Sequence, residues 1–382
     1  MRNSLALLLR RTTVGALALA GMWAPASALA VAPVAPSSQE AGRLPFAQRY
    51  HALQHGGIAR AANVSISCRT PRSNYPFPPS TARSCPATRE GGTGVNGDFD
   101  MMYVDVDKDP NTYNSSRAEV RVPEGSRVSY ARLYWGGNLR VGEQKPPKDN
   151  GRVLVAEQGG EYKEVLADTV VGHRVAHGAD AFQASADVTS LVRESGPGLY
   201  TVAQVNVAMG RSTAGAWGGW TLVVAYENPE QPLRHLAVWD GFDALKSGAG
   251  QEIRLRGMRF PAGAGGRAGL VTYDGDHGAT GDTLTLTATR TSSAQLPHHT
   301  EVTSLADPAN PRADVLNSTI SEPGTSEPRR VPAYNRTLGY DSDVFDLGAG
   351  LRHGGDQLAF RVVSQRDVIW AGVLFVAVDA QR

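Results

Sequence analysis

The sequence predicts an all-β protein built from two packed antiparallel β-sandwiches of jelly-roll type. Apolar and polar residues alternate at every second position in several short segments, which include 118–122, 253–256, 283–289 and 358–362. Turn-forming pairs such as Gly-Gly, Asn-Gly and Asp-Gly stand between these segments. No segment keeps a helical 3.6-residue period for long, so we expect strands almost throughout.

The alternating segments predict strands with one face in a core and the other in water. Residues 221–226 and 373–378 are apolar throughout, which is typical of central strands covered on both faces. Residues 187–192 (DVTSLV) begin with an aspartate that can cap a helix, and they predict a single helical turn.

The order of motifs in the first half of the chain recurs in the second half. The segments that correspond are 131–137 with 268–276, 187–191 with 343–347, 198–202 with 356–360, and 220–226 with 370–376. An internal duplication that yields two sandwiches of similar topology explains this order. Chance similarity among β-strands is the alternative.

The N-terminus has the layout of a secretory signal peptide. Arg10 and Arg11 close a basic region, residues 14–24 form a short apolar region, and Ala28-Leu29-Ala30 matches a cleavage site. A membrane anchor is the alternative, but the apolar stretch is shorter than the roughly 20 residues that a spanning helix needs. We therefore expect export, cleavage near Ala30, a secreted extracellular product and no membrane span in the mature chain.

Composition shifts divide the rest of the chain into three parts. Residues 31–95 predict a Pro-rich linker followed by a disulfide-stapled N-terminal segment, residues 96–230 the first sandwich, and residues 231–382 the second. The chain has two cysteines, Cys68 and Cys85, and a close pair in an oxidising compartment predicts a disulfide. A metal site is the alternative, but it needs four ligands and no histidine is near in sequence.

The charge balance argues against a nucleic-acid partner. The whole chain has a formal net charge of +1, and residues 1–30 carry three arginines and no acid, so the remainder stands at −2. A nucleic-acid binder would carry a basic surface, and so would a protein held on a membrane by charge.

Asp105, Asp107, Asp109 and Asn111 alternate along one extended segment. If the loop bends, these oxygen ligands can converge on a Ca²⁺ ion, which takes six to eight oxygens. The segment is not an EF-hand, because Pro110 and Ser116 stand where that motif has Gly and Glu. A polar turn rich in Asp is the alternative.

Three aromatic residues, Tyr134, Trp135 and Trp239, lie beside glycines or at strand ends. Such rings can stack on sugars, although aromatic residues of sandwiches more often fill the core. Two acidic groups, Asp274, Asp276 and Asp282, and Asp341, Asp343 and Asp346, suit either paired-carboxylate glycoside chemistry or hairpin turns. His173 and His177 have a spacing that binds metal on a helix, but Gly flanks them, and His298 and His299 are expected in a solvated polar loop.

Several phrases resemble a family of uncharacterised secreted bacterial proteins of actinobacteria and myxobacteria, in which this region often precedes surface-type repeat domains. The phrases span residues 50–380 and are 58–68 (IARAANVSISC), 105–109 with 114–116, 133–137 (LYWGG), 186–189 (ADVT), 219–227 (GWTLVVAYE), 239–242 (WDGF), 317–320 (NSTI) and 334–341 (YNRTLGYD). The resemblance implies an exported β-rich domain with no established activity. Because the chain ends at Arg382 without repeats or a sorting motif, we expect free secretion.

Together these features predict an exported binding or adhesion module, not an enzyme, that recognises an envelope glycan or a protein partner. No nucleophile elbow and no phosphate-binding loop is present in the sequence. A structural part of an extracellular assembly is the second hypothesis, and a secreted glycoside or other hydrolase is the third.

Overall fold

The computed structural model confirms the all-β prediction of packed antiparallel sandwiches: every strand pairing between named strands is antiparallel. The structure describes residues 44–69, 84–245, 248, 250–291, 297–324, 329–366 and 368–381, without the side chains of residues 173 and 174. The predicted signal peptide (1–30), the first part of the linker (31–43) and the side chain of His173 lie outside the described residues. No helix in the described ranges has the length and hydropathy needed to cross a membrane.

The largest sheet has nine strands in the order β18-β14-β20-β12-β1-β11-β5-β9-β8. These are β1 (Leu44–Val64), β5 (Arg127–Asn138), β8 (Thr169–Ala176), β9 (Ala179–Asp187), β11 (Gly218–Glu227), β12 (Leu233–Leu245), β14 (Gly266–Tyr273), β18 (Tyr340–Asp346) and β20 (Ile369–Asp379). A five-stranded sheet consists of β17 (Arg330–Val331), β4 (Ser115–Val120), β10 (Gly198–Ala203), β6 (Arg152–Glu157) and β7 (Lys163–Leu166). A four-stranded sheet consists of β13 (Gln251–Phe260), β19 (Gly355–Val363), β15 (Thr283–Arg290) and β16 (His299–Leu305).

The remaining elements of the described residues are short. The strands β2 (Ile66–Cys68) and β3 (Met101–Tyr103) form a two-stranded sheet. The helices are α1 (Cys85–Arg89), α2 (Thr189–Ser195) and the 3₁₀ turns η1 (Asn96–Asp98), η2 (Pro147–Asp149) and η3 (Gly348–Gly350). The helical turn expected at residues 187–192 is therefore α2, and the Asp187 carboxylate accepts a hydrogen bond from the Thr189 amide at 2.9 Å just before it.

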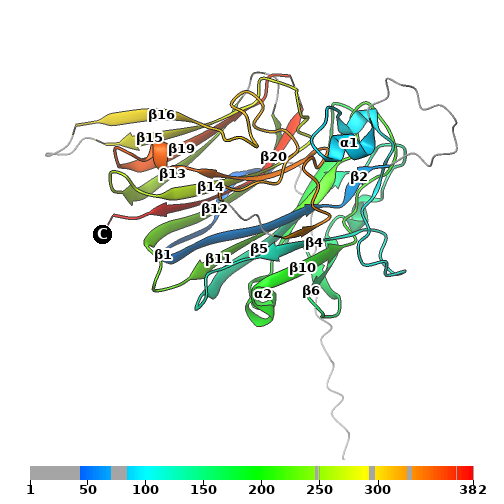
Figure 1. The fold of residues 1–382 in the computed structure, drawn as a ribbon, viewed down its shortest axis with the longest axis horizontal. Coiled ribbons are helices and arrows are strands. Elements are labelled where there is room, and N and C mark those ends of the chain that lie inside the picture. Colours follow the sequence, from blue (N-terminus) through cyan, green and yellow to red (C-terminus); the bar gives the residue numbers. More distant parts are fainter. Residues whose placement is uncertain are drawn as a thin grey trace, which may run out of the picture. The chain divides into compact units, whose positions relative to one another are not determined.

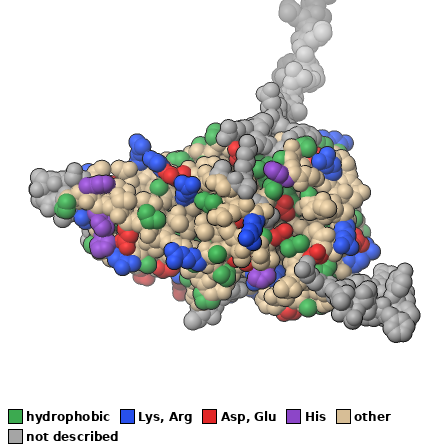
Figure 2. Space-filling model, turned by 90° about the horizontal axis from the view of Figure 1, so that it is seen from above, with side chains coloured by type: hydrophobic (Ala, Val, Ile, Leu, Met, Phe, Trp, Pro, Cys, Tyr) green, Lys and Arg blue, Asp and Glu red, His purple; other side chains and the backbone are tan. Residues whose placement is uncertain are grey.

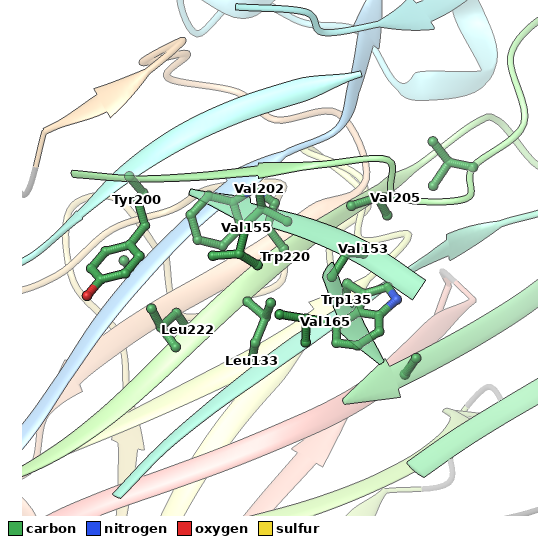
Figure 3. Packing of buried hydrophobic residues seen from close by; sticks show 14 of the residues in the cluster. Leu133, Trp135, Val153, Val155, Val165, Tyr200, Val202, Val205, Trp220 and Leu222 are labelled. Atoms are coloured by element: carbon green, nitrogen blue, oxygen red, sulfur yellow. The ribbon is translucent and has the colours of Figure 1, made fainter. Parts of the chain in front are cut away.

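The sheets form two sandwiches that lie back to back. The five-stranded sheet covers the half of the large sheet that contains β5 and β11, and the four-stranded sheet covers the half that contains β14 and β20. Figure 1 shows β13, β15, β16 and β19 together at the upper left and β4, β6 and β10 at the lower right. Figure 3 shows the first core, where side chains of β5 and β11 point toward those of β6 and β10.

A third core lies between the two halves of the nine-stranded sheet, which face each other. The rings of Trp217 and Tyr273 lie 5.8 Å apart across it, and the Tyr273 hydroxyl donates a hydrogen bond to Gln183 at 3.2 Å. One long strand joins the halves, because the first part of β1 pairs with β12 and the second part pairs with β11. The strand changes partner at Gly56, where a side chain would lie 1.9 Å from the Tyr226 carbonyl oxygen.

The strand order repeats between the two halves, as the sequence motifs predicted. In the large sheet, β11-β5-β9 corresponds to β20-β14-β18, and in the outer sheets β4-β10-β6-β7 corresponds to β13-β19-β15-β16. Three of the four motif pairs fall on corresponding strands (β5 with β14, β10 with β19, β11 with β20). In the fourth pair, residues 343–346 belong to β18, whereas residues 187–191 run from the end of β9 into α2. One register irregularity, at Gly372, turns Trp370 into the third core, whereas its counterpart Trp220 faces the first core.

Two pairs of glycines sit opposite each other where β5 meets β11, with Gly136 paired to Gly219 and Gly137 paired to Gly218. A Cβ on Gly136 would lie 2.4 Å from the Phe182 carbonyl oxygen, and a Cβ on Gly137 would lie 2.8 Å from that of Trp217. Backbone atoms cannot move away as a flexible side chain can. The Gly-Gly phrases of the sequence therefore mark close approach of the chain to itself.

Replacing Gly137 by alanine is expected to lower the free energy of unfolding by about 1–3 kcal/mol, as is usual for overpacking a core. Gly348→Ala is the matched control, because a Cβ there would meet only the Asp346 carboxylate, at 3.1 Å. Urea unfolding of both variants measures the difference. Equal stabilities of the two variants would contradict this account.

The predicted disulfide is confirmed: Cys68 and Cys85 are bonded, with their Cα atoms 5.7 Å apart. It links the end of β2 to the start of α1 across a separation of 17 residues. Replacing both cysteines by serine is expected to cost about 3 kcal/mol of stability, since the bond restricts the unfolded chain. Thermal unfolding with and without reductant measures this cost. The account is contradicted if a thiol assay shows that the disulfide of the wild type is reduced while its melting temperature stays unchanged.

Candidate functional site

The aromatic residues proposed as a ligand platform lie mostly in the core. Tyr134 and Trp135 are fully buried, and the Trp135 indole donates a hydrogen bond to the Asn150 carbonyl at 2.8 Å. Of the three, only Trp239 keeps partial exposure, and it packs against the core between the four-stranded sheet and the large sheet. Because two of the three rings have no face open to solvent, the aromatic trio does not form a sugar-stacking surface, and the core role is the one the structure gives them.

Tyr134 belongs to a buried ionic network between the two halves of the molecule. Its hydroxyl donates to the Asp240 carboxylate at 3.1 Å, and burial raises the pKa of Tyr134. Arg49 binds the same carboxylate with two nitrogens, at 2.8 and 3.0 Å. Arg132, whose side chain is 3% exposed, lies 3.8 Å from it and also pairs with Asp168 at 3.0 Å. We refer to these groups as the Asp240 network.

The segment proposed to bind Ca²⁺ is a turn closed by its own hydrogen bonds. The Asp107 carboxylate accepts from the Asp109 amide at 2.9 Å, from Thr112 at 3.1 Å and from the Tyr162 hydroxyl. Asp105 accepts from Ser115 at 2.9 Å. Asp109 accepts from the amide and the side chain of Asn111, at 2.9 and 2.8 Å. Each carboxylate thus accepts hydrogen bonds from donors of the loop. Asp105 and Asp107 lie close enough to interact, but the three carboxylates do not all come within 4.8 Å of one another.

The two other acidic groups of the sequence do come together, because β14 pairs with β18. This pairing sets Thr272 opposite Asp341 and Leu270 opposite Asp343. The loop after β14 then lies over the same carboxyls: a Cβ on Gly275 would lie 2.6 Å from the Asp341 carboxylate. The Asp274 carboxylate accepts a hydrogen bond from Asn96 at 2.8 Å. Asp346, at the far end of β18, is exposed and stands apart.

Asp341 and Asp343 are 1% and 2% exposed, and their carboxyls face the loop 307–321. Asp343 accepts hydrogen bonds from the amide and the hydroxyl of Ser321, both at 2.8 Å, and from Thr319 at 3.1 Å. Asp341 accepts from the Thr319 amide at 3.1 Å, and its second oxygen is buried without a hydrogen-bond partner. Burial raises the pKa of Asp343 to about 7, and burial followed by the charge of Asp343 raises the pKa of Asp341.

A cleft of about 230 Å³ opens directly in front of this buried pair. We call it the Arg336 cleft, and its lining is polar: Glu90, Gly91, Pro308, Ala309, Thr319, Ile320, Ser321, Arg330, Asn335 and Arg336. Burial lowers the pKa of Arg336, and the charges of Asp314, Asp341 and Asp343 act in the opposite direction. Its Nε atom is buried without a hydrogen-bond partner, whereas Nη1 donates to the Asn317 carbonyl at 3.3 Å.

The Arg336 cleft was not predicted from the sequence, although several of its lining residues belong to two of the sequence segments that carry the family resemblance. Asn335 and Arg336 belong to phrase 334–341, and Thr319 and Ile320 belong to phrase 317–320. Arginine, amide and hydroxyl groups around one small cavity can hold a polar group by several hydrogen bonds at once. A molecule bound in the cleft would not contact the carboxyls of Asp341 and Asp343, because Thr319 and Ser321 lie between them and the cleft.

A family model described as "Protein of unknown function (DUF3344)" matches residues 91–293. No curated protein matches the chain. The major capsid protein P2 from Bacteriophage PM2 is 13% identical, with 72% of this chain and 95% of that chain covered and a TM-score of 0.19. The structure of Sulfolobus Turreted Icosahedral Virus is 9% identical, with 69% of this chain and 86% of that chain covered and a TM-score of 0.21. PNGase F, a glycosylasparaginase from Flavobacterium meningosepticum, is 13% identical, with 73% of this chain and 95% of that chain covered and a TM-score of 0.17.

Proposed function

The chain belongs to the DUF3344 family of proteins of unknown function, and from that premise we propose that it is an exported binding module that holds a polar ligand in the Arg336 cleft. The observation that carries the proposal is the gathering of two arginines, Arg330 and Arg336, with the amide of Asn335 and the hydroxyls of Thr319 and Ser321 around one cleft. Export rests on the predicted signal peptide and agrees with the Cys68–Cys85 disulfide, a bond typical of oxidising compartments.

The chemistry of the lining supports a carboxylate-bearing glycan of the cell envelope as the ligand. A guanidinium group binds carboxylates through paired N–H donors. The hydroxyls of Thr319 and Ser321 and the amide of Asn335 suit the hydroxyl groups of a sugar ring. At about 230 Å³ the cleft is smaller than the roughly 300–1,000 Å³ of drug-sized sites, so it suits one ring or one terminal group.

The proposal assigns no catalytic role to the acidic pair behind the cleft. Glycoside hydrolysis needs two carboxyls that reach the scissile bond from opposite sides. Asp341 and Asp343 are 1% and 2% exposed, and the chain itself satisfies most of their oxygens. The raised pKa values therefore have a structural cause in burial, and this supports a binding protein rather than a hydrolase.

A structural role in an extracellular assembly is the second candidate. It is supported by β8 and β16, which are the last strands of their sheets and expose Val175 (59%) and Val302 (65%). Unpaired strand edges with apolar side chains are sites at which another chain can add a strand. Light scattering of the mature protein over a wide concentration range tests this, and self-association that Val302→Lys abolishes would favour it.

The binding proposal is tested on an array of acidic and neutral envelope glycans with the mature chain, residues 31–382. We expect binding to acidic glycans, and a loss of about tenfold or more on Arg336→Gln, because a charge-assisted pair contributes roughly 1.5–3 kcal/mol. Arg312→Gln is the matched control, since Arg312 is exposed and outside the cleft. Circular dichroism confirms that both variants fold. A blank array, or equal binding by folded Arg336→Gln and wild type, overturns the proposal.

A further inference from the structure

A second polar cluster lies on the four-stranded sheet, where the edge strand β16 meets the turn between η3 and β19. Strand alternation places His299 and Glu301 of β16 on the same side, and His353 of the turn faces them. Figure 2 shows histidine side chains gathered at one end of the surface beside acidic and basic side chains. None of these residues lines the Arg336 cleft.

The three side chains converge closely. One ring nitrogen of each histidine and one carboxylate oxygen of Glu301 all lie within 4.8 Å of one another, and among the described residues no other three such groups do so. The two imidazole rings meet edge to face with centroids 4.6 Å apart. The Nε2 atom of His353 is 3.6 Å from Oε2 of Glu301.

Two of the converging groups contain buried atoms without a hydrogen-bond partner. These atoms are Nε2 of His299 and Oε2 of Glu301. The other oxygen of Glu301, Oε1, pairs with Nε of Arg352 at 3.3 Å, which fixes the carboxylate and leaves Oε2 on the side of His353. A buried acceptor without a donor costs free energy, so the arrangement is incomplete as a purely structural one.

We propose that His299, Glu301 and His353 bind a divalent transition metal ion, and that Zn²⁺ is the ion that this ligand set fits. Two imidazoles and one carboxylate are a ligand set that Zn²⁺ takes with a water in the fourth position. Tetrahedral ligands at Zn²⁺ distances lie about 3.4 Å apart. His353 Nε2 and Glu301 Oε2 are already 3.6 Å apart, and the other ligand atoms, within 4.8 Å of one another, need to close by at most about 1.4 Å. His353 can supply that movement, because its side chain is 51% exposed and belongs to a turn.

The surroundings of the three ligands are also consistent with a metal site. Arg352 is placed as an outer-shell partner that orients the Glu301 carboxylate, although its charge also opposes the cation. The bound ion ties β16, which has a sheet neighbour on one side only, to the turn that precedes β19. Metal binding is thereby expected to stabilise the edge of the four-stranded sheet.

The test uses the mature chain without a histidine tag. Calorimetric titration with Zn²⁺ is expected to give one ion per chain, and Co²⁺ is expected to give the visible absorption of a tetrahedral site. His353→Ala, His299→Ala and Glu301→Gln are each expected to weaken Zn²⁺ binding by roughly tenfold or more, since even outer-shell partners contribute 10–100-fold. Zn²⁺ is also expected to raise the melting temperature of the wild type by mass action.

His298→Ala is the matched control, because His298 neighbours the site in sequence but its ring contacts the Arg290 carbonyl and Thr300 instead. It is expected to bind Zn²⁺ as the wild type does. Circular dichroism shows whether each variant is folded. The proposal is overturned if the wild type takes up no Zn²⁺ at micromolar concentrations, or if the folded ligand variants bind as tightly as His298→Ala.

Discussion

Replacing Asp240 by alanine is expected to lower the free energy of unfolding by about 3–5 kcal/mol, the usual cost of removing one partner from a buried ion pair. The substitution leaves Arg132, 3% exposed, without one of its two carboxylates, and it leaves Arg49 and the Tyr134 hydroxyl without theirs. These groups come from β1, β5 and β12, so the loss acts on both halves of the large sheet at once. Urea unfolding of the mature chain measures it.

The control for Asp240 is an ion pair on the surface. Glu252 and Arg254 pair within β13, with side chains 34% and 66% exposed. Glu252→Ala is therefore expected to cost no more than about 1 kcal/mol, because solvent screens the pair. If Asp240→Ala is no more destabilising than Glu252→Ala, the Asp240 network is not what holds the two halves together.

Replacing Asp343 by asparagine is expected to stabilise the protein at alkaline pH and to leave its stability nearly unchanged at acid pH. Burial raises the pKa of Asp343 to about 7 in the folded protein, from the ordinary value of 3.8. The unfolded chain loses this proton near pH 4 and the folded chain near pH 7. Stability therefore falls as the pH rises between these values and stays low above them.

At pH 8 the ionised, buried Asp343 carboxylate lowers the free energy of unfolding by on the order of a few kcal/mol. Asp343→Asn removes this penalty while it keeps an oxygen that can accept from Ser321 and Thr319. Unfolding measured from pH 4 to pH 9 gives the difference from wild type at each pH. Asp346→Asn, on the same strand but with an exposed side chain, is the matched control. A destabilised Asp343→Asn at pH 8 would mean that the carboxylate form is the one that the fold requires.

The strands could be predicted where one face is buried and the other solvated. Residues 253–256 and 283–289 alternate cleanly and form β13 and β15, and the apolar runs at 221–226 and 373–378 form β11 and β20 between neighbours on both sides. β1 was missed, since residues 31–95 were expected to hold only a linker and a stapled segment. Its first half is mostly exposed or partly exposed, and Gly56 and Gly57 interrupt it, so no alternation marks it.

The sites could be predicted only where their residues are neighbours in sequence. The acidic groups around Asp274 and Asp341 were noticed separately, but their meeting depends on the pairing of β14 with β18, which no local pattern encodes. His299 was expected in a solvated loop because no pattern in its own segment marks the other two residues of the proposed metal site. Glu301 lies two residues away and shares a face with His299 only if the segment is a strand. His353 lies about fifty residues later in the turn before β19, and the pairing of β15 with both β16 and β19 brings it near. Long-range register decides both sites.

The position of β1 has a consequence for the order of events during biogenesis. Gly57 pairs with Tyr226, and Leu53 pairs with His235. β1 can therefore pair only after residues more than 150 positions later in the chain have been synthesised. A topology dominated by such distant pairings folds slowly and only once most of the polypeptide is free. If the chain is exported as proposed, this slow folding would keep it unstructured during passage through a translocation channel.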